Sequence, residues 1–215
     1  MTEKDESNEL DFRNLLERIV ADPKREAEWL DMLSQLEYVG CRKIMKSVPY
    51  EAVSQEVLLH ISEEAAHAVL LKGLVGSDSS SWQKNPLSEM GWRYFQSLDL
   101  EISHLQGIGG FNYPAVSWVI ERRVLQVYPL YLGLTQNADV KRIVAKILAQ
   151  EKRHGGQFER VEYPTGLREK MIAIETRFWR EFVEDLEVYL GGGKGAELSH
   201  RFSGRADFTQ LHATD

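Results

Sequence analysis

The sequence predicts an all-α protein. Apolar residues recur at helical spacing along most of the 215 residues, and no segment shows the apolar–polar alternation typical of a strand. The 16 glycines and six prolines stand mostly between these periodic segments, where they would end helices. A chain of this length suits one helical domain with a sizeable core.

Each expected helix is bounded by residues that begin or end helices. The clearest start is Asn85-Pro86, an N-cap residue followed by a proline suited to the first turn. The clearest end is the glycine run 191–193. In chain order we expect helices over 11–21, with Phe12, Leu15, Leu16 and Ile19 as its apolar face; 24–47, between Pro23 and Pro49; 50–75, ended by Gly73 and Gly76; 86–106, after Asn85 and before the break at 107–113; 114–134, opened by Pro114; 138–160, before Pro164; and 167–190, before the glycine run.

These helices form one domain over 11–190. The polar and acidic segment 1–10 is expected to be a flexible N-terminus. Residues 191–215 have no sustained periodicity and are expected to be a polar tail.

Composition excludes several function classes. The net charge of −7 argues against non-specific DNA binding and against a polybasic membrane anchor. Cys41 is the single cysteine, so neither an intramolecular disulfide nor a Cys-x-x-Cys metal site is expected. The polar start lacks the apolar region of a secretory signal, and no apolar stretch is long enough to span a membrane. We therefore expect a cytoplasmic protein.

Four glutamates lie in the middle of apolar helix faces, where charge is unfavourable. Glu37, for example, shares its face with Leu30, Leu33 and Ile44. A buried carboxylate without a partner is costly, so four of them on four helices need a shared explanation, either arginine partners on neighbouring helices or bound metal. The four are Glu37, Glu64, Glu121 and Glu151.

Two of these glutamates begin the motif Glu-x-x-His. Glu64 is followed by His67, and Glu151 by His154. Positions i and i+3 of a helix project the same way, so one carboxylate and one imidazole can meet one ion. Each motif follows a lone glutamate by about the length of a helical hairpin. Four carboxylates and two imidazoles suit two iron or manganese ions.

Several other residues near these four glutamates and two histidines allow two interpretations. His60 shares the Glu64 face and is either a hydrogen-bond partner of a ligand or an ordinary helix histidine. Cys41 and Tyr128 either approach the metals or pack as core residues. Gly155-Gly156 allows either close helix packing or space beside the metals. Two further Glu-x-x-His matches exist: Glu197 to His200 is read as coincidence in the tail, and Glu101 to His104 is left outside the ligand set, with a supporting role open.

This pattern resembles the ferritin-like di-iron carboxylate superfamily over residues 24–160. The resemblance implies a four-helix bundle with a long crossover between Gly76 and Pro114, plus additional N- and C-terminal helices. It also implies that Glu37 and Glu121 are ligands, that Glu64 and Glu151 are bridging or terminal ligands, and that His67 and His154 bind one metal each.

The expected function is a di-iron oxidoreductase that activates O2 or peroxide, with an oxygenase or hydroxylase favoured. Two iron ions are expected, with mixed manganese–iron or two manganese ions as alternatives. The chain looks similar to rubrerythrin-like peroxide reductases and small hydroxylases but has no rubredoxin module, so it would need a separate electron donor besides its small-molecule substrate. A ferroxidase or metal-storage protein and a non-catalytic helical interaction protein are the alternatives. The helix over 167–190 would cover the bundle or a homodimer partner, which favours an enzyme over a storage cage.

Overall fold

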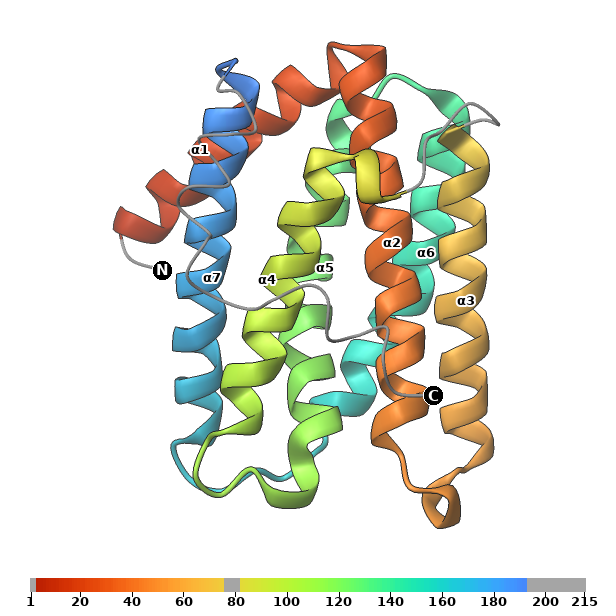
Figure 1. Ribbon diagram of the computed structural model, residues 1–215, viewed down its shortest axis with the longest axis vertical. Coiled ribbons are helices and arrows are strands. Elements are labelled where there is room, and N and C mark those ends of the chain that lie inside the picture. Colours follow the sequence, from red (N-terminus) through yellow and green to blue (C-terminus); the bar gives the residue numbers. More distant parts are fainter. Residues whose placement is uncertain (1–2, 76–81, 193–215) are drawn as a thin grey trace.

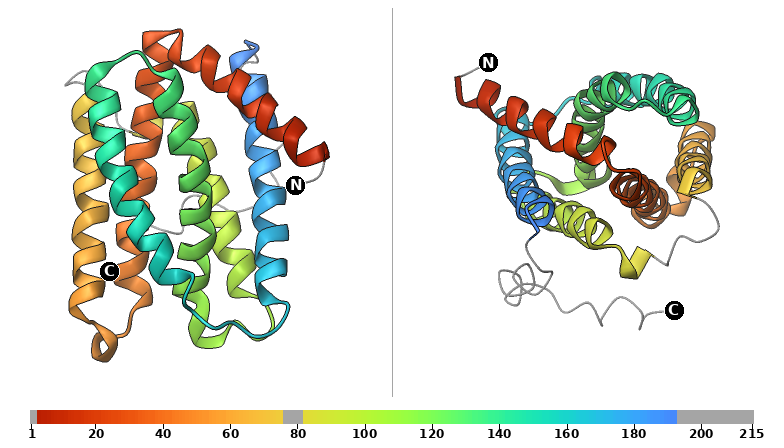
Figure 2. Two further views of the ribbon diagram at one scale, coloured as in Figure 1. Left: turned by 180° about the vertical axis from the view of Figure 1, so that it is seen from behind. Right: turned by 90° about the horizontal axis from the view of Figure 1, so that it is seen from above.

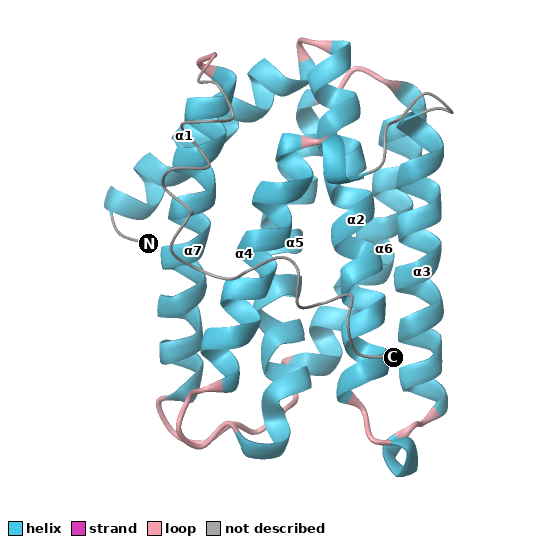
Figure 3. Cartoon of the chain, viewed as in Figure 1, coloured by secondary structure: helices cyan, strands magenta, loops and turns pink. Residues whose placement is uncertain are grey.

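The structure, a computed structural model, describes residues 3–75 and 82–192, and this part of the chain is entirely helical (Figure 3). The predicted all-α class is confirmed. No helix in the described ranges is long and apolar enough to cross a membrane. The α-helices are α1 (Glu3–Val20), α2 (Pro23–Ser47), α3 (Gln55–Val75), α4 (Pro86–Ser103), α5 (Asn112–Leu134), α6 (Ala138–Phe158) and α7 (Leu167–Leu190), with short 3-10 helices at Tyr50–Ala52, Trp82–Lys84 and Gly109–Phe111.

Helix boundaries follow the expected start and stop residues with two main differences. α1 begins at Glu3, because nothing in the polar segment before residue 11 breaks a helix. α3 begins at Gln55 rather than near 50, because Pro49 is followed by a 3-10 turn and the Ser54 hydroxyl then accepts the Val57 N–H. Asn85 caps α4 as expected, since its side chain accepts the Leu87 N–H at 3.0 Å. The tail motif from Glu197 to His200 lies outside the described residues.

Two antiparallel helical hairpins, α2–α3 and α5–α6, lie side by side in the bundle (Figures 1 and 2). The chain between the two hairpins forms α4, which runs along the bundle in the direction opposite to that of α3 (Figure 1). This crossover makes α3 and α5 run in the same direction. α4 packs on α2, α7 packs on α4, and α1 lies across one end of the bundle, where it contacts α2, α5 and α7 (Figure 2).

An aromatic cluster attaches the outer helices to the bundle. Trp179 of α7 stacks on Phe182 with ring centroids 5.2 Å apart and meets Phe12 of α1 edge to face at 4.7 Å. Trp29 of α2 contacts Phe12 and Phe182. Each such pair adds about 0.5–1.5 kcal/mol beyond the area that it buries. These contacts hold α1 and α7 against the same side of the bundle.

A buried ion pair also joins α5 to α7. The Arg123 guanidinium donates two hydrogen bonds to the Glu175 carboxylate, at 2.7 and 2.8 Å, and the Tyr94 hydroxyl of α4 donates a third at 2.8 Å. Such bidentate geometry orients both side chains. Arg123 and Glu175 thereby fix α7 relative to α4 and α5.

Candidate metal centre

Seven buried ligand-type side chains converge at the centre of the two hairpins. All six ligands expected from the sequence are among them, together with His60 of α3. At least nine-tenths of each residue is buried, and His67 is fully buried. We call this set the ligand cluster: Glu37, His60, Glu64, His67, Glu121, Glu151 and His154.

The ligand cluster divides into two groups, each able to hold one ion. The Glu37 group consists of Glu37, Glu64, His67 and Glu151, each offering one ligand atom, and these atoms all lie within 4.8 Å of one another. Within it, His67 Nδ1 lies 2.9 Å from Glu151 Oε1 and 3.4 Å from Glu37 Oε2. Three helices, α2, α3 and α6, supply this group.

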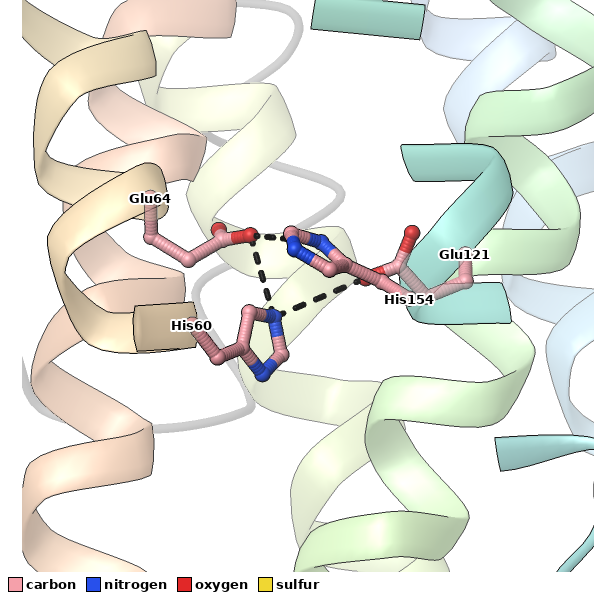
Figure 4. A group of neighbouring side chains, drawn as sticks. All are labelled: His60, Glu64, Glu121 and His154. Atoms are coloured by element: carbon pink, nitrogen blue, oxygen red, sulfur yellow. Dashed lines mark hydrogen bonds and ion pairs between the residues drawn. The ribbon is translucent and has the colours of Figure 1, made fainter. Parts of the chain in front are cut away.

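The His60 group consists of His60, Glu64, Glu121 and His154, from α3, α5 and α6 (Figure 4). His60 Nε2 lies 3.2 Å from Glu64 Oε1 and 3.8 Å from Glu121 Oε1. His154 Nδ1 lies 3.6 and 3.7 Å from the same two oxygens. Glu64 therefore belongs to both groups and could be shared by two ions.

Glu151 also lies between the groups. Its Oε1 faces His67, and its Oε2 lies 3.2 Å from His154 Nδ1. Only Glu64 belongs to both groups, and Glu151, a member of the Glu37 group, also lies close to His154 of the other group.

Buried atoms without partners point to bound cations. His67 Nδ1, Glu121 Oε2 and Glu151 Oε1 have no hydrogen-bond partner, although all are buried. His67 Nδ1 and Glu151 Oε1 approach to 2.9 Å without hydrogen-bond geometry, as two ligands of one ion do. Ligand bonds of about 2.1 Å set neighbouring donor atoms about 3 Å apart and opposite ones about 4.2 Å apart. The residues therefore fit a metal ion in each group.

In each of the three histidines, the ring nitrogen that points away from the ligand cluster, here called the outer nitrogen, has a hydrogen-bond partner. His154 Nε2 lies 2.8 Å from Glu63 Oε2, and His67 Nε2 lies 3.1 Å from Gln150 Oε1. Both partners are acceptors, so each outer nitrogen carries a proton, and each inner Nδ1 would be the atom that binds an ion. The outer nitrogen of His60 is Nδ1, which lies 2.9 Å from the Tyr113 hydroxyl.

These hydrogen bonds of the outer nitrogens link the two Glu-x-x-His motifs across α3 and α6. Glu63 directly precedes Glu64 on α3 yet supports the histidine of α6, and Gln150 directly precedes Glu151 on α6 yet supports the histidine of α3. Gln150 Nε2 also donates to Glu63 Oε1 at 2.8 Å. Neither Glu63 nor Gln150 was among the residues expected at the site. The signal that could have found this pair is a polar residue directly before each motif glutamate.

His60 is the group member that sequence reasoning left open. It stands four residues before Glu64, and the i,i+4 spacing brings both side chains to one face of α3. The second group therefore contains two imidazoles, whereas the first contains one. Two ions in these groups would have different ligand sets.

Burial and mutual repulsion shape the protonation of the cluster. Burial, followed by the charge of neighbouring carboxylates, raises the pKa values of Glu64 and Glu121 well above the usual range. Burial lowers the pKa of His60 to about 4, with the positive charge of His154 adding to the effect. Burial also opposes the charged form of His67, but the carboxylates of Glu151 and Glu37 outweigh it and raise its pKa to about 11. Protons and metal ions thus compete for the same carboxylates, so metal binding releases protons.

The remaining expected residues lie in different places. The Tyr128 hydroxyl donates to Glu37 Oε1 at 2.5 Å, which places it beside the Glu37 group. Cys41 is buried on α2 without belonging to either group. Glu101 pairs with Arg177 at the surface, and His104 is exposed at the end of α4, so neither joins the ligand cluster.

Two glycines explain how the site is accommodated. A Cβ at Gly155 would lie 3.2 Å from the Leu125 side chain, so Gly155 allows close packing of α6 on α5, whereas Gly156 faces open space. A Cβ at Gly40 of α2 would lie 2.8 Å from Glu64 Oε2. Gly40 is therefore the glycine whose lack of a side chain leaves room for a ligand carboxylate.

Comparison with known protein families, curated proteins and solved structures finds no match to the chain.

Proposed function

We propose that this protein is a ferritin-like di-iron carboxylate oxygenase. The observation that carries the proposal is the sharing of Glu64 by two ligand groups, each with at least one buried imidazole. Two helical hairpins joined through α4 supply these ligands, as the resemblance to the superfamily implies. Carboxylate and imidazole donors suit iron or manganese better than softer metals.

Charge balance supports a redox role for the site. Two divalent ions cancel the four negative charges of Glu37, Glu64, Glu121 and Glu151, and oxidation of both ions adds two positive charges. Two iron ions held by the cluster would supply electrons to O2. For a hydroxylation, substrate R–H, O2, two electrons and two protons give R–OH and water. The electrons come from a separate reductant, because the single cysteine excludes a rubredoxin-type centre in this chain.

The protein supplies orientation and exclusion of water. Glu63 and Gln150 hold the histidines of the two motifs, and Tyr128 holds Glu37. The surrounding apolar side chains keep water from the reacting groups.

An apolar cavity beside the ligands favours an oxygenase over the alternatives. The cavity holds about 120 Å³ and is lined in part by Glu37, Glu64 and Glu121. Iron storage and peroxide reduction need no space for an organic molecule, whereas hydroxylation requires a substrate beside the metals.

Iron loading tests the proposal. We expect two Fe(II) per chain after anaerobic loading, and charge-transfer absorbance of a diferric site after exposure to air. Glu121→Ala and His154→Ala should each reduce the iron content and the absorbance. Glu101→Ala is the matched control, because Glu101 begins the same Glu-x-x-His pattern but pairs with Arg177 at the surface.

Four results would contradict the proposal. Zero or one iron per chain would leave a helical protein without a dinuclear site, and normal loading of both cluster variants would mean that the iron binds elsewhere. A large cage that mineralises iron would indicate storage. Rapid reoxidation by peroxide with no reaction toward O2 would indicate a peroxide reductase.

A further inference from the structure

A second cavity lies between α1, α5 and α7, on a different side of α5 from the ligand cluster (Figure 2). We call it the outer cavity, and none of the seven cluster residues lines it. Its lining on α5 centres on Gln126, which lies about 140° around the helix from Glu121 at about 100° per residue. Its volume of about 710 Å³ is within the range of about 300–1,000 Å³ that small-molecule sites occupy.

Apolar side chains form most of the wall of the outer cavity. Phe12 and Val127 are buried, whereas Ile172 of α7 is 37% exposed, so the wall extends from the core to the surface. Transfer of an apolar body from water to such a wall favours binding. The apolar lining includes Phe12, Val119, Leu125, Val127, Leu130 and Ile172.

Two of the three arginines that line the outer cavity are paired with carboxylates. Arg123 donates two hydrogen bonds to Glu175, at 2.7 and 2.8 Å, and the Tyr94 hydroxyl donates a third at 2.8 Å, so the charge of Glu175 is compensated. Arg13 of α1 pairs with Glu17 at 3.2 Å, and both side chains are half exposed. Neither pair adds net charge to the cavity.

Arg122, the third arginine, carries positive charge in excess of the nearby carboxylates. Its Nη1 lies 3.9 Å from Glu159 Oε1, which is longer than a hydrogen bond. Glu159 already accepts a hydrogen bond from Arg168 at 2.7 Å, so two guanidinium groups share one carboxylate. The Arg122 side chain is 43% exposed. In a chain with a net charge of −7, this part of the cavity is therefore locally positive.

Gln126 stands about one turn after Arg122 and presents hydrogen-bond donors beside it. Arg123 Nη1 donates to Gln126 Oε1 at 2.7 Å. Because a guanidinium only donates, this bond turns the amide oxygen toward Arg123 and the NH2 group away from it. Positions i and i+4 share one helix face, so this NH2 group and the Arg122 guanidinium can bind one anion. Thr176 of α7 adds a hydroxyl group to the same cavity.

We propose that the outer cavity binds an apolar carboxylic acid, with its carboxylate on Arg122 and Gln126 and its apolar body between α5 and α7. A single arginine with excess charge matches a single negative charge, whereas a phosphate would bring nearly two. A planar carboxylate also accepts two hydrogen bonds from one guanidinium. Because no member of the ligand cluster lines the outer cavity, this binding is independent of the proposed di-iron function.

Titration of the full-length protein with pyrenebutyrate tests the proposal. This probe combines a large apolar ring system with one carboxylate, and its fluorescence anisotropy rises when it binds to a protein. We expect saturable binding at one molecule per chain. The uncharged counterpart, pyrenebutanol, should bind about tenfold more weakly, because it lacks the charged acceptor for Arg122.

Two pairs of variants test the location of the bound probe. Arg122→Met keeps an unbranched side chain but removes the charge, and it should weaken pyrenebutyrate binding about tenfold. Arg142→Met is its control, because the Arg142 side chain is 71% exposed on α6 and lies outside the cavity. Ile172→Trp adds a ring to the cavity wall and should weaken binding of both probes. Val69→Trp is its control, since Val69 is 71% exposed on α3 and lies outside the cavity.

The uncharged probe separates recognition of charge from a general disturbance of the fold. Arg122→Met should leave pyrenebutanol binding unchanged, and an equal loss for both probes would overturn the assignment. No saturable binding of pyrenebutyrate, equal affinity for the two probes, or wild-type affinity in Arg122→Met or Ile172→Trp would also overturn it. Pyrenebutyrate binding by a protein that takes up no iron would support the outer cavity and refute the di-iron function. Normal iron loading without pyrenebutyrate binding would do the reverse.

Discussion

Replacement of Glu63 tests how far the metal site depends on the contacts behind the histidines. Glu63 accepts the outer N–H of His154 at 2.8 Å and also accepts from Gln150 and Arg153, each at 2.8 Å. Glu63→Ala removes all three contacts without removing a ligand. Loss of such a partner typically costs about 10–100-fold in metal affinity, which corresponds to about 1.4–2.7 kcal/mol. We expect this loss mainly at the His60 group, because His154 belongs to that group.

Glu63→Gln separates the hydrogen bond from the charge. The amide oxygen can still accept the His154 N–H, so we expect a loss of affinity of about tenfold or less. Anaerobic Fe(II) titration against a competing chelator measures both variants, with Glu56→Ala as the control because Glu56 is exposed in the first turn of α3. Wild-type affinity in Glu63→Ala, or a larger loss in Glu63→Gln than in Glu63→Ala, would refute the reasoning.

Further predictions concern the glycine, the ion pair, the metal and pH. Gly40→Ala should lower the iron content, because its Cβ would lie 2.8 Å from Glu64 Oε2. In Gly73→Ala the added Cβ would meet no atom within 4 Å, so the iron content should stay unchanged and the helix should be stabilised by about 1 kcal/mol. Metal analysis and urea unfolding check both variants. Arg123→Ala should lower the free energy of unfolding by about 3–5 kcal/mol because it leaves a buried carboxylate without its cation, and a loss below 1 kcal/mol in urea unfolding would contradict this. Iron at a hundred times its Kd should raise the free energy of unfolding by about 2.7 kcal/mol, and calorimetry showing no shift in Tm would count against binding to the folded state. Burial opposes the charge of Glu63, but the hydrogen bonds that it accepts from Arg153, His154 and Gln150 lower its pKa to about 2. The stability that this charge contributes is therefore present above pH 4.5 and is lost as pH falls toward 2. Over that range, the free energy of unfolding of the iron-free wild-type protein should fall more steeply than that of Glu63→Gln.

The helical class and most helix boundaries could be predicted because they depend on local chemistry. Asn85 and Pro86 begin α4 through backbone contacts within one turn, and the glycine run after residue 190 ends α7. The start of α3 was misplaced because Ser54 competes with Pro49 as the point where the helix begins, and the sequence does not rank the two.

The candidate ligands could also be predicted, since helical periodicity shows which glutamates face the core. Glu37, Glu64, Glu121 and Glu151 were found in this way, and the i,i+3 spacing added His67 and His154. Periodicity assigns a residue to a face but does not measure its distance from residues on other helices. His60 therefore remained open, and Glu101 with His104 resembled a ligand pair although Glu101 lies at the surface beside Arg177.

By itself, the sequence determined that the protein is helical and that four carboxylates and two imidazoles lie on buried helix faces, because both properties repeat within single helices. Only the tertiary structure decided which atoms meet. The packing of α3 against α6 pairs Glu63 with His154 and Gln150 with His67, and it makes Glu64 common to two ligand groups. The cavity beside the ligands also depends on the placement of α4 and α7, which supply part of its lining. These relations involve residues up to about ninety positions apart in the chain, where only the packing of helices sets the distances.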